Sequence, residues 1–215
     1  MNLKVMVVDD HRIVREGLVT LLERLPGIKV VAQAETGTEA VKLARELAPD
    51  VIIMDISLPD LNGVEATRRI LARPCRTKVI ALSMHADRRF VIESLKAGAS
   101  AYLLKDAAFD ELSRAIDAVV NGGTYLSSKI SDLLIKEYNR KKDGSDPTAY
   151  SLLTSRERQV LQLLAEGNST KQIAGSLGVS IKTIETFRQQ IMNKLNLHSV
   201  AELTKYAIRE GITTL

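Results

Sequence analysis

Five short apolar runs, separated by stretches of helical periodicity, organise the first half of this chain. The runs are Leu3–Val8, Val30–Ala34, Val51–Met54, Val79–Leu82 and Ala101–Leu104. Runs that are apolar throughout and alternate with amphipathic stretches are typical of parallel strands with helices on both faces of the sheet. We therefore predict an α/β flavodoxin-like domain, doubly wound around a five-stranded parallel sheet of order 2-1-3-4-5.

The stretches between the runs place apolar residues at helical spacing. Two such faces are Ile13, Val14, Gly17, Leu18, Leu21, Leu22 and Leu25 in the first stretch, and Phe109, Leu112, Ile116, Val119 and Val120 after the last run. We expect these faces to pack against the sheet.

Polar residues follow the first, third, fourth and fifth runs. Asp9 and Asp10 follow the first run, Asp55 the third, Ser83 the fourth and Lys105 the fifth. Ligands of open α/β sheets bind beyond the carboxyl ends of the strands, which meet at one edge. We therefore expect these side chains to converge there.

Three clustered carboxylates repel one another unless one is protonated or a cation lies among them. Oxygen ligands favour a hard ion such as Mg²⁺. We expect His11 to begin the first helix. Such a metal, together with Lys105, would neutralise the oxygens of a phosphoryl group while a carboxylate attacks in line. Asp55 is the best nucleophile because it stands alone, whereas Asp9 and Asp10 form a pair suited to metal binding. The alternative is that the pair caps a helix and Asp55 is a solvated loop acid.

These residues resemble the receiver domain of two-component response regulators. The resemblance covers residues 3–121 and rests on Asp9-Asp10, Asp55-x-x-Leu-Pro-x-x-x-Gly63, Ser83 and Gly98–Lys105. It implies that Asp55 accepts a phosphoryl group from the phosphohistidine of a histidine kinase. The Mg²⁺ ligands that it implies are Asp10, Asp55, the main-chain carbonyl of Ser57 and, through water, Asp9.

The same resemblance implies how the phosphorylated state is recognised. Lys105 would pair with the phosphoryl oxygens, and Ser83 would hydrogen-bond them. Tyr102 would turn inward at the same time.

The alternating pattern stops after residue 123. Apolar residues at helical spacing continue over residues 126–139, and residues 140–147 combine charge, Gly and Pro without an apolar residue. We predict a receiver domain at 1–123, a linker with a helix at 124–149, and a second domain at 150–215.

Three helix starts follow in the second domain. Thr154 with Glu157, and Ser169 with Gln172, match capping boxes, and Ser180 can cap a third helix from Ile181 to Leu195. The second helix ends at Gly178, two residues before Ser180. Two helices joined by so short a turn are typical of a helix-turn-helix.

The third helix has one apolar side and one polar side. The apolar side is Ile184, Phe187, Ile191 and Leu195, and the polar side is Lys182, Glu185, Thr186, Gln189 and Asn193. Amide, hydroxyl and charged groups can read base edges in the major groove, and basic side chains can contact phosphates. The alternative is a polar face that is simply solvated.

The distribution of charge favours nucleic acid as the partner of the second domain. Residues 1–122 contain 17 Lys+Arg and 17 Asp+Glu, whereas residues 123–215 contain 13 and 9, so the whole net charge of +4 lies there. A basic C-terminal part beside a neutral N-terminal part indicates that only the former meets a polyanion.

The C-terminal motifs resemble the LuxR-type helix-turn-helix, which joined to a receiver makes a response regulator of the NarL/FixJ type. The resemblance implies base contacts from Glu185, Thr186 and Gln189, and backbone contacts from Lys171, Lys182, Thr183 and Arg188. Phe187 stands where the family usually has a His that contacts phosphate, so that contact is expected to be missing. A last helix at about 199–210 would form the contact of a homodimer. It is apolar enough for this through Ala201, Leu203, Tyr206, Ala207 and Ile208, and we expect some of these residues to pack in the core instead.

The remaining composition excludes several other classes of protein. The single Cys75 rules out a disulfide framework. No apolar run approaches the roughly 20 residues that cross a bilayer, and Asp9 and Asp10 come too early for a signal peptide. We therefore expect a cytoplasmic protein without a membrane contact.

Together these features predict a phosphorylation-controlled transcription factor, not an enzyme, that binds double-stranded DNA at two half-sites. Two alternatives remain open at this point. One is a transcription regulator whose receiver acts without phosphorylation. The other is a phosphatase with Asp55 as its nucleophile, although no substrate-binding cap segment is evident.

Overall fold

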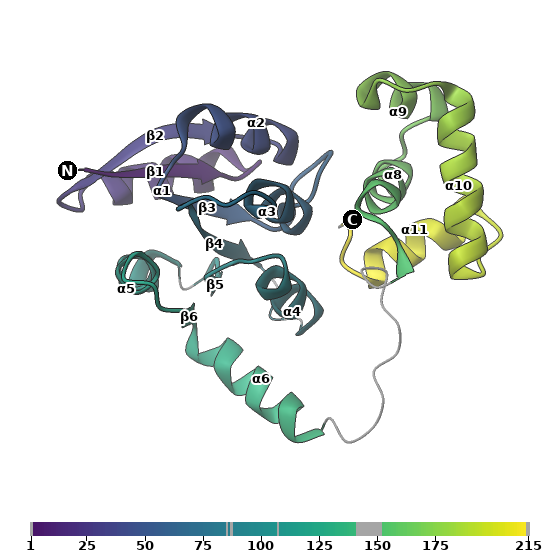
Figure 1. The fold of residues 1–215 in the computed structure, drawn as a ribbon. Helices are drawn as coiled ribbons and strands as arrows, with labels where there is room; N and C mark the ends of the chain where they lie inside the picture. The colour runs from purple at the N-terminus through teal and green to yellow at the C-terminus, as the bar shows by residue number, and fades with distance from the viewer. Residues whose placement is uncertain (1, 85, 87, 107, 141–151, 214–215) are drawn as a thin grey trace. The chain divides into compact units, whose positions relative to one another are not determined.

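A computed structural model describes residues 2–84, 86, 88–106, 108–140 and 152–213 (Figure 1). The chain divides into two compact units, residues 1–143 and 144–215.

The first unit is built on a parallel sheet. Its strands are β1 (Leu3–Val8), β2 (Ile28–Ala34), β3 (Val51–Asp55), β4 (Lys78–Ser83), β5 (Ala101–Leu104) and β6 (Tyr125–Leu126). Their order is β2-β1-β3-β4-β5-β6, and every pair is parallel. The predicted flavodoxin-like fold and the order of its first five strands are confirmed. The expectation of five strands was wrong by one, because a strand of two residues is too short to show a periodic pattern.

The alternation of side chains along each strand divides the core between the two faces of the sheet. On β1, Val5 and Val7 belong to a cluster that includes Leu18 of α1 (Arg12–Glu23) and Leu112 of α5 (Ala108–Val120). Met6 and Val8 of β1 belong to the opposite cluster, with residues of α2 (Gly37–Leu47) and α3 (Gly63–Leu71). Helix α4 (Arg88–Lys96) packs beside α3 and against β5 (Figure 1). Both faces of the sheet are therefore covered, as continuous apolar strands require.

Two residues assigned to apolar helix faces do not pack in the core. Ile13 is 86% exposed and Val120 is 48% exposed. At 3.6 residues per turn, Ile13 points roughly 140° away from Leu18, which is fully buried. The prediction that Ile13 lies on the buried face of α1 was therefore wrong.

The beginning of the expected linker is part of the first unit. Residues Tyr125 and Leu126 pair with Ala101 and Tyr102 of β5, and α6 (Ser128–Arg140) follows directly. Ile130 of α6 is fully buried. The basic triplet at 140–142 and the Gly- and Pro-containing segment after it lie almost wholly outside the described residues.

The second unit contains four described helices, α8 (Ser155–Ala165), α9 (Thr170–Leu177), α10 (Ile181–Leu195) and α11 (Val200–Arg209). Both predicted capping boxes are present, and a third occurs at Ser199 with Glu202. Helix α9 ends at Gly178, whose φ of 64° is left-handed and suits Gly. The core residues are Leu153, Val160, Leu161, Leu163, Leu164, Ile173, Ala174, Ile184, Ile191, Leu203, Ala207 and Ile212.

Within the described residues, no helix is both long enough and apolar enough to cross a membrane.

Candidate functional site

Two buried aspartates and a lysine meet at the carboxyl edge of the sheet. Asp9 directly follows β1, Asp55 is the last residue of β3, and Lys105 directly follows β5. Asp9 and Asp55 are 0% and 1% exposed. The Lys105 Nζ lies 2.7 Å from Asp9 Oδ2 and 2.8 Å from Asp55 Oδ2, so one ammonium bridges both carboxylates.

The electrostatics of this group show that its negative charge is incompletely compensated. Burial raises the pKa of the Asp55 carboxyl, and the Asp9 carboxylate adds to the rise, although Lys105 opposes both. Burial alone would lower the pKa of Lys105, but Asp55 and Asp9 outweigh it, so that pKa is raised. Two buried carboxylates therefore share one cation, and an additional positive charge would stabilise their ionised state.

Asp10 and His11 complete an acidic cluster, which we define as Asp9, Asp10, His11 and Asp55. One possible ligand atom from each of these residues lies within 4.8 Å of those of the others. The carboxylates are the hard oxygen donors that Mg²⁺ prefers, and the raised pKa of Asp55 shows a need for positive charge. The cluster thus fits a divalent cation.

His11 begins α1, as expected, and its side chain also lies beside two carboxylates. It is the N-cap residue of α1, but its side chain makes no capping hydrogen bond. Its Nδ1 lies 2.8 Å from Asp10 Oδ1 and 3.3 Å from Asp9 Oδ1. The feature of the sequence that indicates this position is that His11 directly follows Asp9 and Asp10.

The backbone around Asp55 is held by a close approach to α3. A Cβ atom on Gly63 would lie 2.0 Å from the Asp55 carbonyl oxygen, and the Gly63 N–H donates to the Ile56 carbonyl at 2.9 Å. Only Gly permits this contact. The Ser57 N–H in turn donates to Asp55 Oδ1 at 3.1 Å. The turn after β3 therefore fixes one oxygen of Asp55, while Lys105 contacts the other.

Arg15 holds the segment that carries Asp9. Its side chain is buried, its Nη1 donates to the Asp9 carbonyl at 2.6 Å, and its Nη2 pairs with Glu35 at 2.5 Å. Arg15 could not be predicted as part of the site, because an Arg in an amphipathic helix is ordinarily solvent-exposed.

Ser83 and Tyr102 are both buried, Ser83 at the end of β4 and Tyr102 within β5. Ser83 ends β4 and is 0% exposed, and its carbonyl accepts a hydrogen bond of 2.8 Å from the Lys105 N–H. Tyr102 lies within β5, paired with Ala81 of β4 and Leu126 of β6. It is fully buried. His85, two residues after Ser83, lies outside the described residues.

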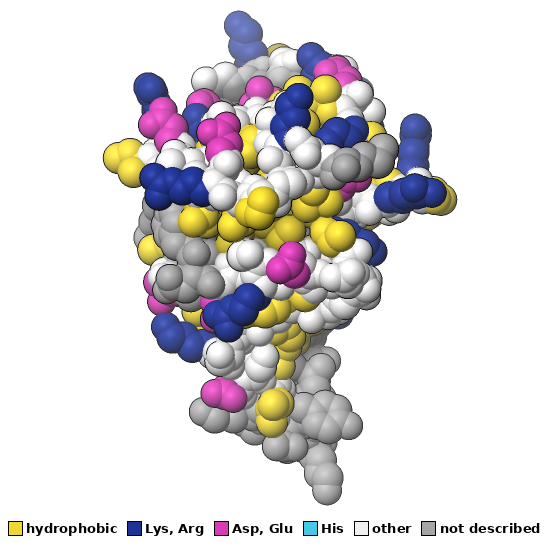
Figure 2. Space-filling model, turned by 90° about the vertical axis from the view of Figure 1, so that its left-hand side faces the viewer, with side chains coloured by type: hydrophobic (Ala, Val, Ile, Leu, Met, Phe, Trp, Pro, Cys, Tyr) yellow, Lys and Arg dark blue, Asp and Glu magenta, His cyan; other side chains and the backbone are white. Residues whose placement is uncertain are grey.

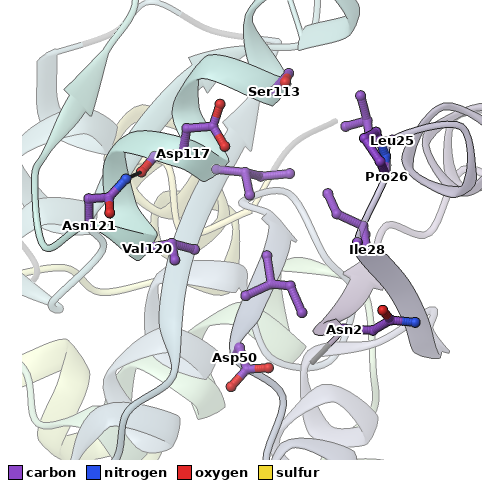
Figure 3. A pocket seen from close by; sticks show the side chains of 12 residues that line it. Asn2, Leu25, Pro26, Ile28, Asp50, Ser113, Asp117, Val120 and Asn121 are labelled. Atoms are coloured by element: carbon purple, nitrogen blue, oxygen red, sulfur yellow. Dashed lines mark hydrogen bonds between the residues drawn. The ribbon is translucent and has the colours of Figure 1, made fainter.

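A pocket opens at the opposite, amino-terminal edge of the sheet. It is lined by Leu3 and Ile28 at the starts of β1 and β2, by the turn before β2, and by the end of α5 (Figure 3). Apolar side chains gather at the centre of the face on this side of the molecule, flanked by charged ones (Figure 2). None of the acidic-cluster residues lines this pocket. The cluster is therefore identified by its chemistry and not by the depth of a cavity.

The second unit carries its polar groups on an exposed helix face. Lys171 of α9 and Lys182, Glu185, Thr186 and Gln189 of α10 are exposed, whereas Thr183 and Arg188 are half-buried. We call these seven residues the recognition surface. The Thr186 hydroxyl donates to the Lys182 carbonyl at 3.0 Å, and the Gln189 amide donates to Asn193 at 3.0 Å. The opposite side of α10 inserts Ile184 and Ile191 into the core.

An ion pair joins α10 to α8. Glu157 is 3% exposed and accepts hydrogen bonds from the Thr154 N–H at 2.8 Å and from Lys194 Nζ at 2.7 Å. Burial opposes the ionised form, but these partners prevail and lower the pKa of Glu157. The capping residue of α8 thus also fixes the end of the helix that carries the recognition surface.

Core packing uses part of the apolar side of α11, as expected. Leu203 and Ala207 are fully buried in the core, so they are not free for contact with a second chain. Ala201 is exposed, and Tyr206 and Ile208 are half-buried.

Comparisons with known proteins agree with both halves of this description. Residues 5–117 match the family model of the response regulator receiver domain, and residues 151–207 match that of the bacterial regulatory proteins of the LuxR family. The transcriptional regulatory protein MctR of Rhizobium johnstonii is 37% identical over 213 residues, which cover 99% of this chain and 96% of MctR.

Two solved structures are similar to this chain. A LuxR-family two-component response regulator from Aurantimonas sp. SI85-9A1 is 39% identical with a TM-score of 0.62, over 65% of this chain and 99% of that one. The RcsB response regulator of Salmonella typhimurium is 29% identical with a TM-score of 0.60, over 95% of this chain and 97% of that one. The chain therefore belongs to the DNA-binding response regulators that join a receiver domain to a LuxR-type helix-turn-helix.

Proposed function

We propose that Asp55 is the phosphoryl acceptor of this response regulator and that its phosphorylation by a histidine kinase controls DNA binding by the second unit. The observation that carries the proposal is the bridge from Lys105 to Asp55 and Asp9, at 2.8 and 2.7 Å, on the edge of the sheet where ligands bind. A lysine in this position can neutralise phosphoryl oxygens as a carboxylate attacks.

The proposed transfer uses one oxygen of Asp55. This oxygen attacks the phosphorus of a phosphohistidine, the P–N bond breaks, and the imidazole of the kinase leaves with the electron pair. The product is an acyl phosphate on Asp55. The Ser57 N–H, at 3.1 Å, orients the Asp55 carboxylate. Lys105 offsets the repulsion between this carboxylate and that of Asp9.

A divalent cation is part of the proposal, with Asp10, Asp55 and the Ser57 carbonyl as its ligands and Asp9 acting through water. When bound, Mg²⁺ supplies positive charge that offsets the charge of the phosphoryl oxygens. The shared burial of Asp9 and Asp55 beside a single lysine supports a need for that charge. Ser83 and Tyr102 would then report the phosphorylated state to the rest of the receiver.

The second part of the proposal is that α10 enters the major groove of double-stranded DNA. Glu185, Thr186 and Gln189 would contact bases, and Lys171, Lys182, Thr183 and Arg188 would contact the backbone. A solved complex of the related regulator RcsB with DNA, 28% identical with a TM-score of 0.60, supports DNA as the partner. A homodimer would place two such helices on half-sites about one helical turn apart. The cytoplasmic location expected from the sequence stays a prediction.

Phosphorylation of the purified full chain tests the proposal. Acetyl phosphate with Mg²⁺ is expected to add one phosphoryl group per chain, measured by intact mass, and chelation of the metal is expected to prevent it. Asp55→Asn is expected to abolish the modification. Asp60→Asn is the matched control, since Asp60 lies in the same loop and its φ of 64° suits Asn.

Unmodified wild-type protein under these conditions would contradict the role of Asp55 and favour a regulator that acts without phosphorylation. Continuous turnover of the phosphodonor, with acetyl phosphate consumed far beyond one equivalent in an Asp55-dependent way, would instead favour a phosphatase.

A further inference from the structure

His11 provides a nitrogen donor inside a site whose other donors are oxygens. Its Nδ1 lies 2.8 Å from Asp10 Oδ1 and 3.3 Å from Asp9 Oδ1. Two ligands at neighbouring corners of an octahedral ion with bonds of about 2.1 Å are separated by about 3.0 Å. The contact of 2.8 Å pairs a protonated Nδ1 with Asp10, and it is also close to the spacing of adjacent metal ligands, so a metal bound at Nδ1 would take the place of that proton.

The His11 side chain has no part in stabilising its helix. The described caps of other helices use the side chains of Thr36, Asn62, Thr154, Ser169, Ser180 and Ser199 to accept helix N–H groups. His11 occupies the N-cap of α1 without such a bond, and turns its ring toward the carboxylates. A capping function thus does not explain why an imidazole lies here.

The backbone holds this donor in place before any metal binds. The His11 N–H donates to Asp9 Oδ1 at 2.9 Å, and Arg15 Nη1 donates to the Asp9 carbonyl at 2.6 Å. Lys105 occupies Oδ2 of both Asp9 and Asp55. The carboxylate oxygens near the imidazole are therefore Asp10 Oδ1 and Asp9 Oδ1, neither of which contacts Lys105.

We propose that His11 is a metal ligand of the acidic cluster, and that it makes the site favour first-row transition ions such as Mn²⁺, Co²⁺ and Ni²⁺ over Mg²⁺. This inference rests on the proposed function, because it takes the acidic cluster as the metal site of the receiver. Imidazole suits these ions, whereas Mg²⁺ prefers oxygen. His11 binds as the neutral tautomer, with Nδ1 on the metal and the proton on Nε2. Its side chain is 65% exposed, which leaves room for that proton to be solvated.

Calorimetric titration of the full chain with NiCl₂ and with MgCl₂, without a phosphodonor, tests the role of His11. His11→Asn keeps a side-chain N–H that can donate to Asp10 but removes the ring nitrogen. We expect this variant to lose at least about tenfold in Ni²⁺ affinity, because removing even a residue that only hydrogen-bonds a metal ligand typically costs that much. Its Mg²⁺ affinity is expected to stay near the wild-type value. His198→Asn is the matched control, since His198 is an exposed histidine of the second unit.

Co²⁺ provides a readout that a merely structural role of His11 would not move. The visible absorption of bound Co²⁺ is expected to change between the wild type and His11→Asn, because one nitrogen ligand is replaced by water. His85→Asn is expected to leave both the spectrum and the Ni²⁺ affinity unchanged.

The possible failures are distinguishable from one another. If Mg²⁺ binds the wild type but Ni²⁺ affinity is unaffected by His11→Asn, or is lost in His85→Asn instead, the inference falls and the proposed function stands. If neither ion binds the wild type, both fall. Equal losses of Ni²⁺ and Mg²⁺ affinity in His11→Asn would show that His11 positions Asp10 and is not itself a ligand.

Discussion

The two units place their working side chains in opposite environments. In the receiver, Asp9 and Asp55 are almost fully buried and are tied to Lys105 and to backbone N–H groups. In the second unit, Glu185 and Gln189 lie exposed on a helix whose other side is anchored in the core by Ile184 and Ile191. A buried charged site changes the stability of its own fold whenever its charge changes, whereas an exposed surface can change its partner without affecting the fold.

This comparison is most severely tested by a pair of glycines, one in each unit. Gly63→Ala is expected to destabilise the receiver by about 3 kcal/mol or more, because the new Cβ would meet the Asp55 carbonyl oxygen at 2.0 Å. Gly175→Ala is expected to stabilise the second unit by about 0.5–1 kcal/mol, because nothing lies within 4 Å and α9 gains a better helix former. Chemical denaturation of both variants measures these changes. Similar effects of the two substitutions would contradict the close approach of α3 to Asp55.

The next largest effect is expected at Glu157. This buried acid of α8 forms an ion pair with Lys194 of α10. Glu157→Gln is expected to cost about 1–3 kcal/mol, since the Lys194 and Thr154 hydrogen bonds to a charged group are weakened. The folded pKa of Glu157 is lowered, so its contribution is present above the unfolded pKa and is lost as pH falls through the folded pKa. Hydrogen exchange, expressed as the protection of the α8 and α10 amides relative to their intrinsic exchange rates, measures this contribution. Between mildly acidic and neutral pH, this protection should change less in the variant than in the wild type.

A smaller effect of opposite sign is expected at Asp55. Its folded pKa is raised, so its favourable contribution is complete below the unfolded pKa and is lost as pH rises through the folded pKa. Near neutral pH, Asp55→Asn should therefore raise the melting temperature of the receiver, by about 2–4 °C for a gain of ~1 kcal/mol. Calorimetry at pH 7 without metal measures the shift. A lower melting temperature would mean that the pairing with Lys105 outweighs the burial of the charge.

The smallest effect on folding is expected at the recognition surface. Gln189→Ala should leave the free energy of unfolding within about 0.5 kcal/mol of the wild type, because the side chain is exposed and its hydrogen bond goes to the likewise exposed Asn193. The same change should weaken binding to a selected DNA site by about 1–3 kcal/mol if Gln189 contacts a base. Lys182→Ala should instead reduce the dependence of binding on salt, as expected for a phosphate contact. Fluorescence anisotropy at several salt concentrations separates the two roles.

The strands and helix starts could be predicted because each depends on neighbours in sequence. Continuous apolar runs marked the first five strands, and Thr154, Ser169 and Ser180 marked helix starts that the structure confirms. The sixth strand could not be found, since Tyr125 and Leu126 become a strand only by pairing with β5. Ile13 was misassigned because helical spacing groups residues but does not say which group meets the sheet.

The sequence by itself determined the order of the elements, the positions of Asp9, Asp55 and Lys105 at strand ends, and the polar face of α10, because these follow from local periodicity and residue type. Only the tertiary structure decided that one lysine bridges Asp9 and Asp55, that Gly63 must pass against the Asp55 carbonyl, and that the ring of His11 faces the carboxylates. Such contacts depend on distances between segments far apart in the chain or on the direction of a single side chain. Neither these distances nor this direction is encoded in a local sequence pattern. Both are fixed only when the strands align and their ends meet at a common edge.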